Sequence, residues 1–304
     1  MKMFYIVLGA KGYVGRRFVR YLENINNKYR SSHEQVSYVG LSHTELDYTD
    51  ARTFENWIEF NKPRWKDTAV FVINCAGKTG RPNVDQCEIK KADTIRLNIV
   101  LPAMLSDTCE RHGLTFCHVS SGCIYSGSKE RVFTEMDPPN FAYDNKNHSF
   151  YSGSKALAEE YVLRNPRCYV WRIRMPFDER NVERSYLSKL LKYDTLIDAT
   201  NSLTHLGDFI MTSYDMMRHN SPYGLYNMVN EGSISTREIV DIMKQELKLD
   251  KQFKFFESHE AFGATVKTPR SNCVISCSKV NSIPDIRPMR PIEDALRDAL
   301  RNWC

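Results

Sequence analysis

The 304-residue chain lacks any apolar run of the roughly 18 residues that a membrane-spanning helix needs. Its first residues, 1–9, are mostly apolar, but they are too few for the apolar part of a signal peptide followed by a cleavage site of small residues. Such a short segment is typical of a first β-strand instead. We therefore expect a cytoplasmic protein.

Regular cysteine spacing is also missing. None of the nine cysteines forms a C-x-x-C pair of the zinc-binding type, so neither a disulfide framework nor a metal site is expected. Unpaired thiols suit the reduced cytosol. The net charge of +5 comes from scattered basic residues rather than from one block. It is weak evidence for nucleic acid and mildly favours an anionic substrate.

Apolar segments of strand length alternate with longer segments of helical periodicity, a pattern typical of a parallel sheet wrapped by helices. Strands are expected at 4–8, 36–41, 69–74, 115–120 and 168–173. Helices are expected after the first strand and at 51–60, 85–112 and 151–163, with a break or kink at Pro102 in the third of these. Together these elements predict a doubly wound dinucleotide-binding fold.

The alternation loosens beyond Arg174, where prolines separate shorter elements. We expect an α/β protein with a Rossmann-type sheet in residues 1–174. A smaller, interleaved α/β domain in residues 175–304 would mainly bind substrate and return some segments to the first domain. One helix there is predicted to start at Ser235, because Ser235 and Glu238 have capping-box spacing ahead of apolar residues.

A glycine-rich loop, residues 9–15, directly follows the first predicted strand. Glycines let the backbone turn tightly there and let a pyrophosphate approach the N-terminus of the next helix, whose amides and dipole favour anions. This context makes the motif credible as a dinucleotide site rather than as a turn without a ligand. The expected cofactor-binding residues of the loop are Gly9, Gly12, Tyr13, Val14 and Gly15.

The choice between the two nicotinamide cofactors depends on the end of the second strand, where an acidic residue would bind the ribose 2′-hydroxyl of NAD. No carboxylate stands directly at Ser42, and Arg16 could meet a 2′-phosphate. NADPH is therefore expected. Glu45 and Asp47 lie close enough to keep NADH open, and Asp47 could instead face the adenine.

Three polar residues form the pattern of a carbonyl-reducing site. Tyr151 and Lys155 are four residues apart and so share a helical face, where the ammonium can lower the pKa of the phenol. Ser121 ends the preceding strand and can hydrogen-bond the same carbonyl oxygen. The phenol would donate a proton to that oxygen as hydride reaches the carbon.

At this level of detail the sequence resembles the extended short-chain dehydrogenase/reductases. Within them it is similar to the plant-type UDP-4-keto-6-deoxyglucose 3,5-epimerase/4-reductases of UDP-L-rhamnose synthesis. The motifs that carry the resemblance are Asn74-Cys75-Ala76-Gly77, Asn98, Thr79-Gly80-Arg81-Pro82-Asn83-Val84-Asp85, Ser121-Gly122-Cys123-Ile124-Tyr125, Phe150-Tyr151-Ser152, Arg172-Ile173-Arg174-Met175-Pro176 and Pro269-Arg270-Ser271-Asn272. Plant-type members have Thr in place of Ser121 and Phe in place of Tyr125.

The resemblance implies an acid and a base at carbon, because inverting C3 and C5 beside a 4-keto group requires proton exchange on both faces. Cys123 and Lys189 match the positions of that pair. A 4-keto reductase needs neither of them, and without the resemblance Cys123 would be a small core residue and Lys189 a solvated surface charge. The resemblance further implies cofactor contacts at Ala76, Gly77 and Met175 and substrate contacts at Thr79, Arg81, Asn83, Arg174 and Arg270.

Other functions remain open at this stage. A reductase-only enzyme, similar to dTDP-4-dehydrorhamnose reductase, would leave Cys123 idle, and some relatives of that reductase are NADP-binding regulatory subunits without activity. The resemblance also implies a homodimer through helices near 85–112 and 151–163, and a separate 4,6-dehydratase that supplies the UDP-sugar substrate.

Overall fold

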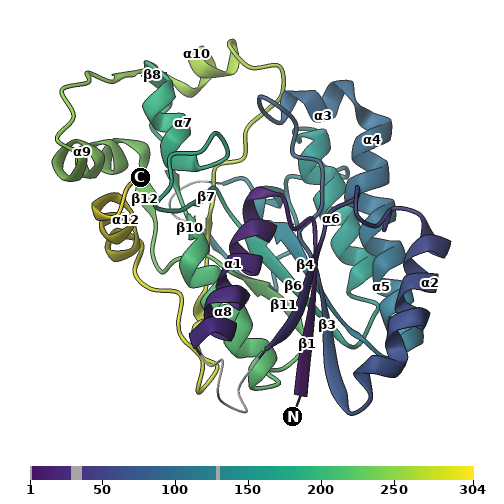
Figure 1. Ribbon diagram of the computed structural model, residues 1–304. Helices are drawn as coiled ribbons and strands as arrows, with labels where there is room; N and C mark the ends of the chain where they lie inside the picture. Colours follow the sequence, from purple (N-terminus) through teal and green to yellow (C-terminus); the bar gives the residue numbers. More distant parts are fainter. Residues whose placement is uncertain (1, 29–35, 128–130) are drawn as a thin grey trace.

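The computed structural model describes residues 2–28, 36–127 and 131–304. Its centre is a parallel sheet that has six strands within these ranges, in the order β11-β6-β4-β3-β1-β2, with helices on both faces (Figure 1). The strands are β1 (Lys2–Leu8), β2 (Ser37–Leu41), β3 (Thr68–Asn74), β4 (Thr115–Ser121), β6 (Cys168–Ile173) and β11 (Gly224–Asn227). The predicted Rossmann-type α/β fold is thereby confirmed.

Each strand of the sheet supplies side chains to both faces, because successive residues of a strand point in opposite directions. In β1, Tyr5 and Val7 join the core cluster under α1 (Tyr13–Lys28) and α8 (Leu206–Arg218). Ile6 and Leu8 join the cluster on the other face. That face is covered by α2 (Ala51–Asn61), α5 (Leu101–His112) and α6 (Phe150–Val162).

The long helix expected over 85–112 is divided in the structure. It consists of α3 (Asp85–Ile89), α4 (Lys91–Ile95), a π-helical turn η2 (Arg96–Val100) and α5. The break lies at Lys90, whose φ of −104° and ψ of 56° are not helical. Pro102, expected to break or kink the helix, lies at the start of α5, directly after the π-helical turn, and Val100 and Leu101 before it keep a helical backbone.

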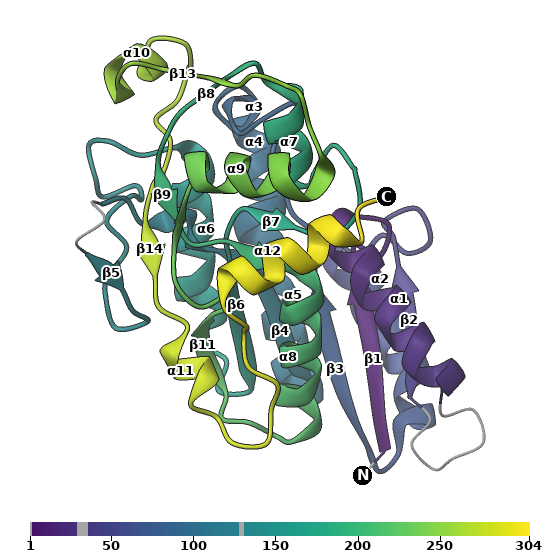
Figure 2. The same ribbon diagram turned by 90° about the vertical axis from the view of Figure 1, so that its left-hand side faces the viewer.

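A smaller lobe lies beyond the carboxyl ends of the strands and contains α7 (Tyr186–Lys192), α9 (Thr236–Leu247), α10 (His259–Gly263) and α12 (Ile292–Arg301). Figure 2 shows α9 and α12 side by side, and both contribute to one apolar cluster with α7. The predicted capping box is present at the start of α9, where Ser235 and Glu238 each accept a hydrogen bond from the other's backbone amide.

The remaining elements are short. They are η1 (Lys62–Trp65), η3 (Gly122–Ile124), α11 (Ser278–Asn281), β5 (Val132–Phe133), β7 (Pro176–Phe177), β8 (Thr195–Leu196), β9 (Thr200–Asn201), β10 (Thr204–His205), β12 (Ile234–Ser235), β13 (Lys254–Phe255) and β14 (Val274–Ile275). The late segment β11 pairs with β6 in the main sheet, and α8 packs on α1, so the chain returns to the main sheet after α7.

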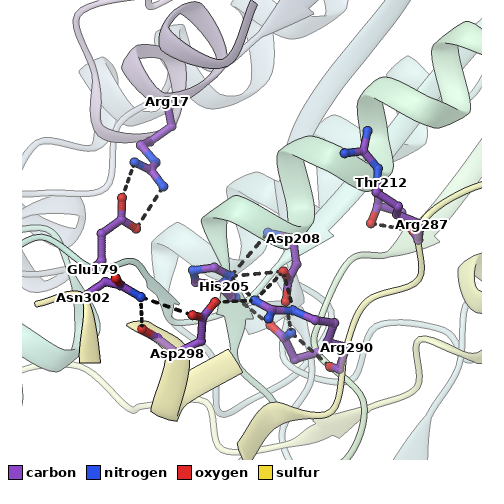
Figure 3. A network of polar contacts seen from close by, with 10 residues as sticks. Arg17, Glu179, His205, Asp208, Thr212, Arg287, Arg290, Asp298 and Asn302 are labelled. Atoms are coloured by element: carbon purple, nitrogen blue, oxygen red, sulfur yellow. Dashed lines mark hydrogen bonds and ion pairs between the residues drawn. The ribbon is translucent and has the colours of Figure 1, made fainter. Parts of the chain in front are cut away.

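Charged groups join the two lobes on the side of α1 and α8 (Figure 3). Arg17 of α1 makes a two-pronged ion pair with Glu179, at 2.6 and 3.0 Å. Arg290 bridges the buried Asp208 of α8 and Asp298 of α12, at 2.9 and 3.1 Å. These contacts fix the C-terminal segment against α1 and α8 of the sheet-containing lobe. Among the described helices, none is long and apolar enough to cross a membrane.

Candidate active site

The glycine loop packs so tightly that side chains would not fit at two of its positions. Gly9 has a φ of 75°, and a Cβ there would lie 2.9 Å from the backbone nitrogen of Ala76. A Cβ on Gly15 would lie 2.3 Å from the Gly9 carbonyl oxygen. Because α1 begins within this loop, at Tyr13, its free amides face the turn at Gly9. The loop therefore fits a dinucleotide pyrophosphate, as expected for Gly9, Gly12 and Gly15.

The end of β2 holds a carboxylate that the sequence left ambiguous. The backbone amide and hydroxyl of Ser42 both donate to Glu45 Oε2, at 2.8 and 2.7 Å. These bonds, with help from Lys11, lower the pKa of Glu45 to about 2. Asp47 is exposed and accepts from the backbone amide and hydroxyl of Thr49. Lys11 Nζ lies 3.2 Å from Glu45 Oε1, so the charges of these two side chains offset each other.

The loop after β3 is fastened by Asn98 in the π-helical turn. Asn98 Oδ1 accepts from the Lys78 amide at 2.6 Å, and its Nδ2 donates to the Lys78 carbonyl at 2.9 Å and to Ser154 Oγ at 3.0 Å. The π-turn thus places one side chain between the loop that carries Gly77 and the helix α6. These contacts join the loop after β3 to α6.

Ser121, Cys123 and Tyr151 come together where β4 ends and α6 begins. Ser121 caps the turn η3, and its Oγ accepts from the Cys123 amide at 3.2 Å. Burial raises the pKa of the Tyr151 phenol, the neighbouring Cys123 raises it further, and a hydrogen bond with Ser121 works in the opposite direction. Tyr151 is therefore a protonated acid at neutral pH, next to the hydroxyl predicted to share its carbonyl oxygen.

Lys155 lies one turn along α6 and points into the protein. Its Nζ donates to the Val119 carbonyl at 2.9 Å and lies 3.2 Å from His118 Nε2. Burial lowers the pKa of Lys155 to about 8, although Glu159 and Cys75 oppose the shift. The sequence predicted an ammonium close to the Tyr151 phenol; the hydrogen bonds of this side chain lead instead to β4.

A pocket of about 290 Å³ lies between the two lobes and has Cys123, Tyr151, Met175, Lys189 and Arg270 on its walls. Lys189 projects from α7, and its pKa is lowered by burial and by the nearby positive charge of Arg184. A phenol, a thiol and an amine thus border one space. Much of the remaining wall is apolar or aromatic, with Val84, Tyr186, Leu190, Tyr193, Leu196, Ile197, Ala199, Phe262 and Pro269.

The arginine expected at the substrate is in a different place. Arg174 is 1% exposed and does not line the pocket. Its guanidinium donates to Ser271 Oγ, to Cys123 Sγ at 3.4 Å and to Asn201. The prediction that Arg174 binds substrate directly is corrected, because these partners hold it behind Cys123 inside the fold.

Of the other predicted substrate residues, Arg270 lines the pocket, whereas Thr79, Arg81 and Asn83 do not. Arg270 pairs with Asp85 at 2.7 Å, which joins the two lobes. Asn83 Oδ1 accepts from the Asp85 amide. Thr79 and Arg81 are exposed, and Thr79 Oγ1 accepts from Arg184 at 3.0 Å.

Sequence reasoning missed Arg184 and His118. Arg184 donates hydrogen bonds to Thr79 and Gly80, which precede it by about a hundred residues. No local sequence pattern therefore predicts this contact. His118 lies inside a predicted buried strand and its position resembles that of an ordinary core residue. The one available signal was its place three residues before Ser121.

A family model described as the RmlD substrate binding domain matches residues 3–303. The chain belongs to the RmlD family. The RmlD-family chain is 33% identical over 218 residues to an Arabidopsis thaliana bifunctional dTDP-4-dehydrorhamnose 3,5-epimerase/dTDP-4-dehydrorhamnose reductase, covering 69% of the chain and 70% of that relative. A solved structure of the L780 UDP-rhamnose synthase from Acanthamoeba polyphaga mimivirus superposes with a TM-score of 0.84 at 25% identity, covering both chains fully.

A longer relative matches only in part. The Arabidopsis thaliana trifunctional UDP-glucose 4,6-dehydratase/UDP-4-keto-6-deoxy-D-glucose 3,5-epimerase/UDP-4-keto-L-rhamnose-reductase RHM1 is 33% identical over 216 residues, which cover 69% of this chain. The RmlD-family chain spans about a third, 31%, of that protein's length.

Proposed function

We propose that this protein is a bifunctional enzyme, a 3,5-epimerase and NADPH-dependent 4-keto reductase that converts UDP-4-keto-6-deoxy-D-glucose to UDP-L-rhamnose. The observation that carries the proposal is the shared pocket, where Cys123, Tyr151 and Lys189 border one space. The 4-keto reductase half also draws on the family and on the names of the relatives. The choice of UDP rests on the resemblance and on the mimivirus neighbour.

The reductase half uses groups that bind the carbonyl oxygen. Bound NADPH supplies the hydride. Ser121 and Tyr151 hydrogen-bond the C4 oxygen, and the Tyr151 phenol, kept protonated by its raised pKa, transfers its proton to that oxygen as the new C–H bond forms. The glycine loop supports the proposed NADPH site, because the free amides at the start of α1 favour a pyrophosphate.

In the proposed epimerisation, the same side chains hydrogen-bond the C4 oxygen while a C–H bond at C3 or C5 is broken. Removal of the proton at C3 or C5 leaves an enolate, whose oxygen Ser121 and Tyr151 hold. One of Cys123 and Lys189 takes the proton from the first face of the ring, and the other returns a proton to the opposite face. A lowered pKa suits Lys189 for this exchange, because its amine is then available nearer neutral pH.

The direct test is hydrogen exchange on the 4-keto substrate in heavy water without NADPH. Epimerisation predicts deuterium at C3 and at C5 before any reduction. When NADPH is then added, the labelled sugar should be reduced to the rhamnose product. Absence of label together with direct 4-reduction would leave a dTDP-4-dehydrorhamnose-type reductase. Absence of NADPH oxidation with every 4-keto nucleotide sugar would revive a non-catalytic regulatory subunit.

We also propose a cytoplasmic homodimer that receives its substrate from a separate 4,6-dehydratase. Exposed apolar side chains support the dimer: Ile89, Val100 and Tyr161 are 60%, 54% and 40% exposed and lie on or beside α3, η2 and α6. Light scattering tests the assembly, and Val100→Glu should lower the measured mass from that of a dimer to that of one chain.

A further inference from the structure

Three buried polar side chains form a chain of hydrogen bonds behind the catalytic helix. They are Asn74 at the end of β3, His118 in β4 and Lys155 in α6, each at most 5% exposed. Asn74 Nδ2 lies 3.2 Å from His118 Nδ1, and His118 Nε2 lies 3.2 Å from Lys155 Nζ. The proposed reaction steps do not use His118, although it contacts the lysine predicted to serve Tyr151.

The direction of these hydrogen bonds follows from the first of them. The backbone N–H of Ala76 donates to Asn74 Oδ1 at 3.0 Å, which identifies that atom as the amide oxygen. The Asn74 amide nitrogen therefore faces His118, and it can only donate. His118 Nδ1 must accept, so a neutral imidazole carries its one proton on Nε2.

The proton on Nε2 has a consequence for Lys155. An ammonium group only donates hydrogen bonds, so it gains nothing from an N–H group that points at it. An uncharged amine has a lone pair and can accept from Nε2 while it donates to the Val119 carbonyl at 2.9 Å. The local geometry therefore suits the amine form of Lys155.

Other charged and titratable groups near these three side chains also affect the charge of Lys155. From α6, Glu159 favours the charged lysine, but Glu159 is already bound by Arg172 of β6 at 2.6 Å and by Ser120 of β4 at 2.5 Å. From the β3 end, Cys75 acts in the same direction as Glu159. Burial, with a smaller effect of Lys155, holds the pKa of His118 well below its ordinary value, so the imidazole stays neutral. Its tautomer therefore decides whether Lys155 faces an N–H donor or a nitrogen lone pair.

We propose that Asn74 and His118 are positioning residues of the reductase site: Asn74 holds His118 as the Nε2–H tautomer, and that N–H group limits the proton affinity of Lys155. Protonation then releases Lys155 from His118 and leaves its N–H groups to act toward Tyr151, one turn earlier on α6. The pair thereby sets the pH above which Lys155 withdraws from the site. This inference rests on the proposed 4-keto reductase function.

The test uses nuclear magnetic resonance on the full chain, so it does not depend on activity. In the wild type, ¹⁵N shifts of His118 should place the proton on Nε2 across pH 6 to 9, and ¹³C-labelled lysine should give the titration midpoint of Lys155. His118→Phe should raise that midpoint by about one pH unit, a tenfold change in proton affinity. Phe116→Leu is the matched control, because Phe116 stacks beside His118 without bonding Lys155 and should leave the midpoint unchanged.

Two outcomes would overturn the inference: a proton on Nδ1 in the wild type, or an unchanged or lower midpoint in the His118 variant. Asn74→Asp gives a second route if His118→Phe does not fold. Its carboxylate would accept from Nδ1–H, move the imidazole proton away from Nε2 and raise the Lys155 midpoint. If the enzyme reduces 4-keto sugars, the alkaline limb of that reaction should move with the midpoint. A shifted midpoint without any reduction would count against the reductase proposal alone.

Discussion

At the scale of single residues, Cys123 separates an epimerase from a simple reductase. Cys123→Ala should lower deuterium exchange at carbon by roughly 10²- to 10⁴-fold, because it removes a proton-transfer group. Reduction of an already epimerised 4-keto sugar should stay near the wild-type rate. Cys273→Ala is the matched control, since Cys273 is buried nearby but does not line the pocket. Loss of both activities in folded Cys123→Ala would contradict a dedicated role in exchange.

Tyr151 is the proposed acid of the reduction step. Tyr151→Phe should slow reduction of the epimerised substrate by roughly 10²- to 10⁴-fold, because both the polarising hydrogen bond and the transferred proton are lost. Single-turnover oxidation of NADPH measures the effect on the chemical step. A variant that reduces as fast as the wild type would show that another group protonates the oxygen.

The charge of Arg184 should lower the pKa of Lys189, the proposed base. The positive charge of Arg184 disfavours the ammonium form of Lys189 and so contributes to its lowered pKa. In Arg184→Gln that contribution disappears, the pKa of Lys189 rises, and the rising limb of the exchange rate should move to higher pH. Arg184→Lys keeps the charge and should keep the wild-type profile. If the pH dependence of exchange is unchanged in Arg184→Gln, either Lys189 is not the base or Arg184 does not affect its pKa.

The residues that sequence could predict share one property: their chemistry is visible from local position. Ser121 ends a strand, and Tyr151 and Lys155 lie on the helix that follows. Arg174 could not be placed this way, because its burial depends on Ser271 and Asn201, which are distant in the chain.

At the scale of elements, the start of α9 is the sharpest local prediction. Ser235→Ala removes the cap that accepts from Glu238, and it should lower the free energy of unfolding by about 1 kcal/mol. Urea denaturation measures the change. Glu238→Gln is the milder comparison, because glutamine still offers an oxygen to the Ser235 amide. Equal stability of the wild type and the alanine variant would mean that packing alone holds this helix end.

Elements were predictable where periodicity was strong. The strand β6 has the expected bounds, Cys168–Ile173, because a short apolar run between turns is typical of a fully buried strand. The division of 85–112 was not predictable. Its π-turn holds Asn98 in contact with Lys78 and Ser154, which are distant in the chain, so helical periodicity does not predict it.

At the scale of the whole molecule, Lys155 couples the site to stability. Its pKa is about 8 in the folded protein against an ordinary 10.5, so between these values the unfolded chain binds more protons and stability rises with pH. The gain from pH 8 to 10.5 should reach about 3 kcal/mol. Buried thiols and phenols have raised pKa values and act in the opposite direction at alkaline pH, so the quantity to measure is the difference between wild type and Lys155→Met. A pH-independent difference would contradict the shift.

In the proposed reaction, one pocket first exchanges protons at carbon and then reduces the neighbouring carbonyl. The most direct measurement is the position of deuterium in the nucleotide sugar made from the 4-keto substrate by the wild-type protein in heavy water with unlabelled NADPH. We predict deuterium at C3 and C5, protium at C4, and the L-rhamnose configuration. A reduced product with protium at C3 and C5 would contradict the account.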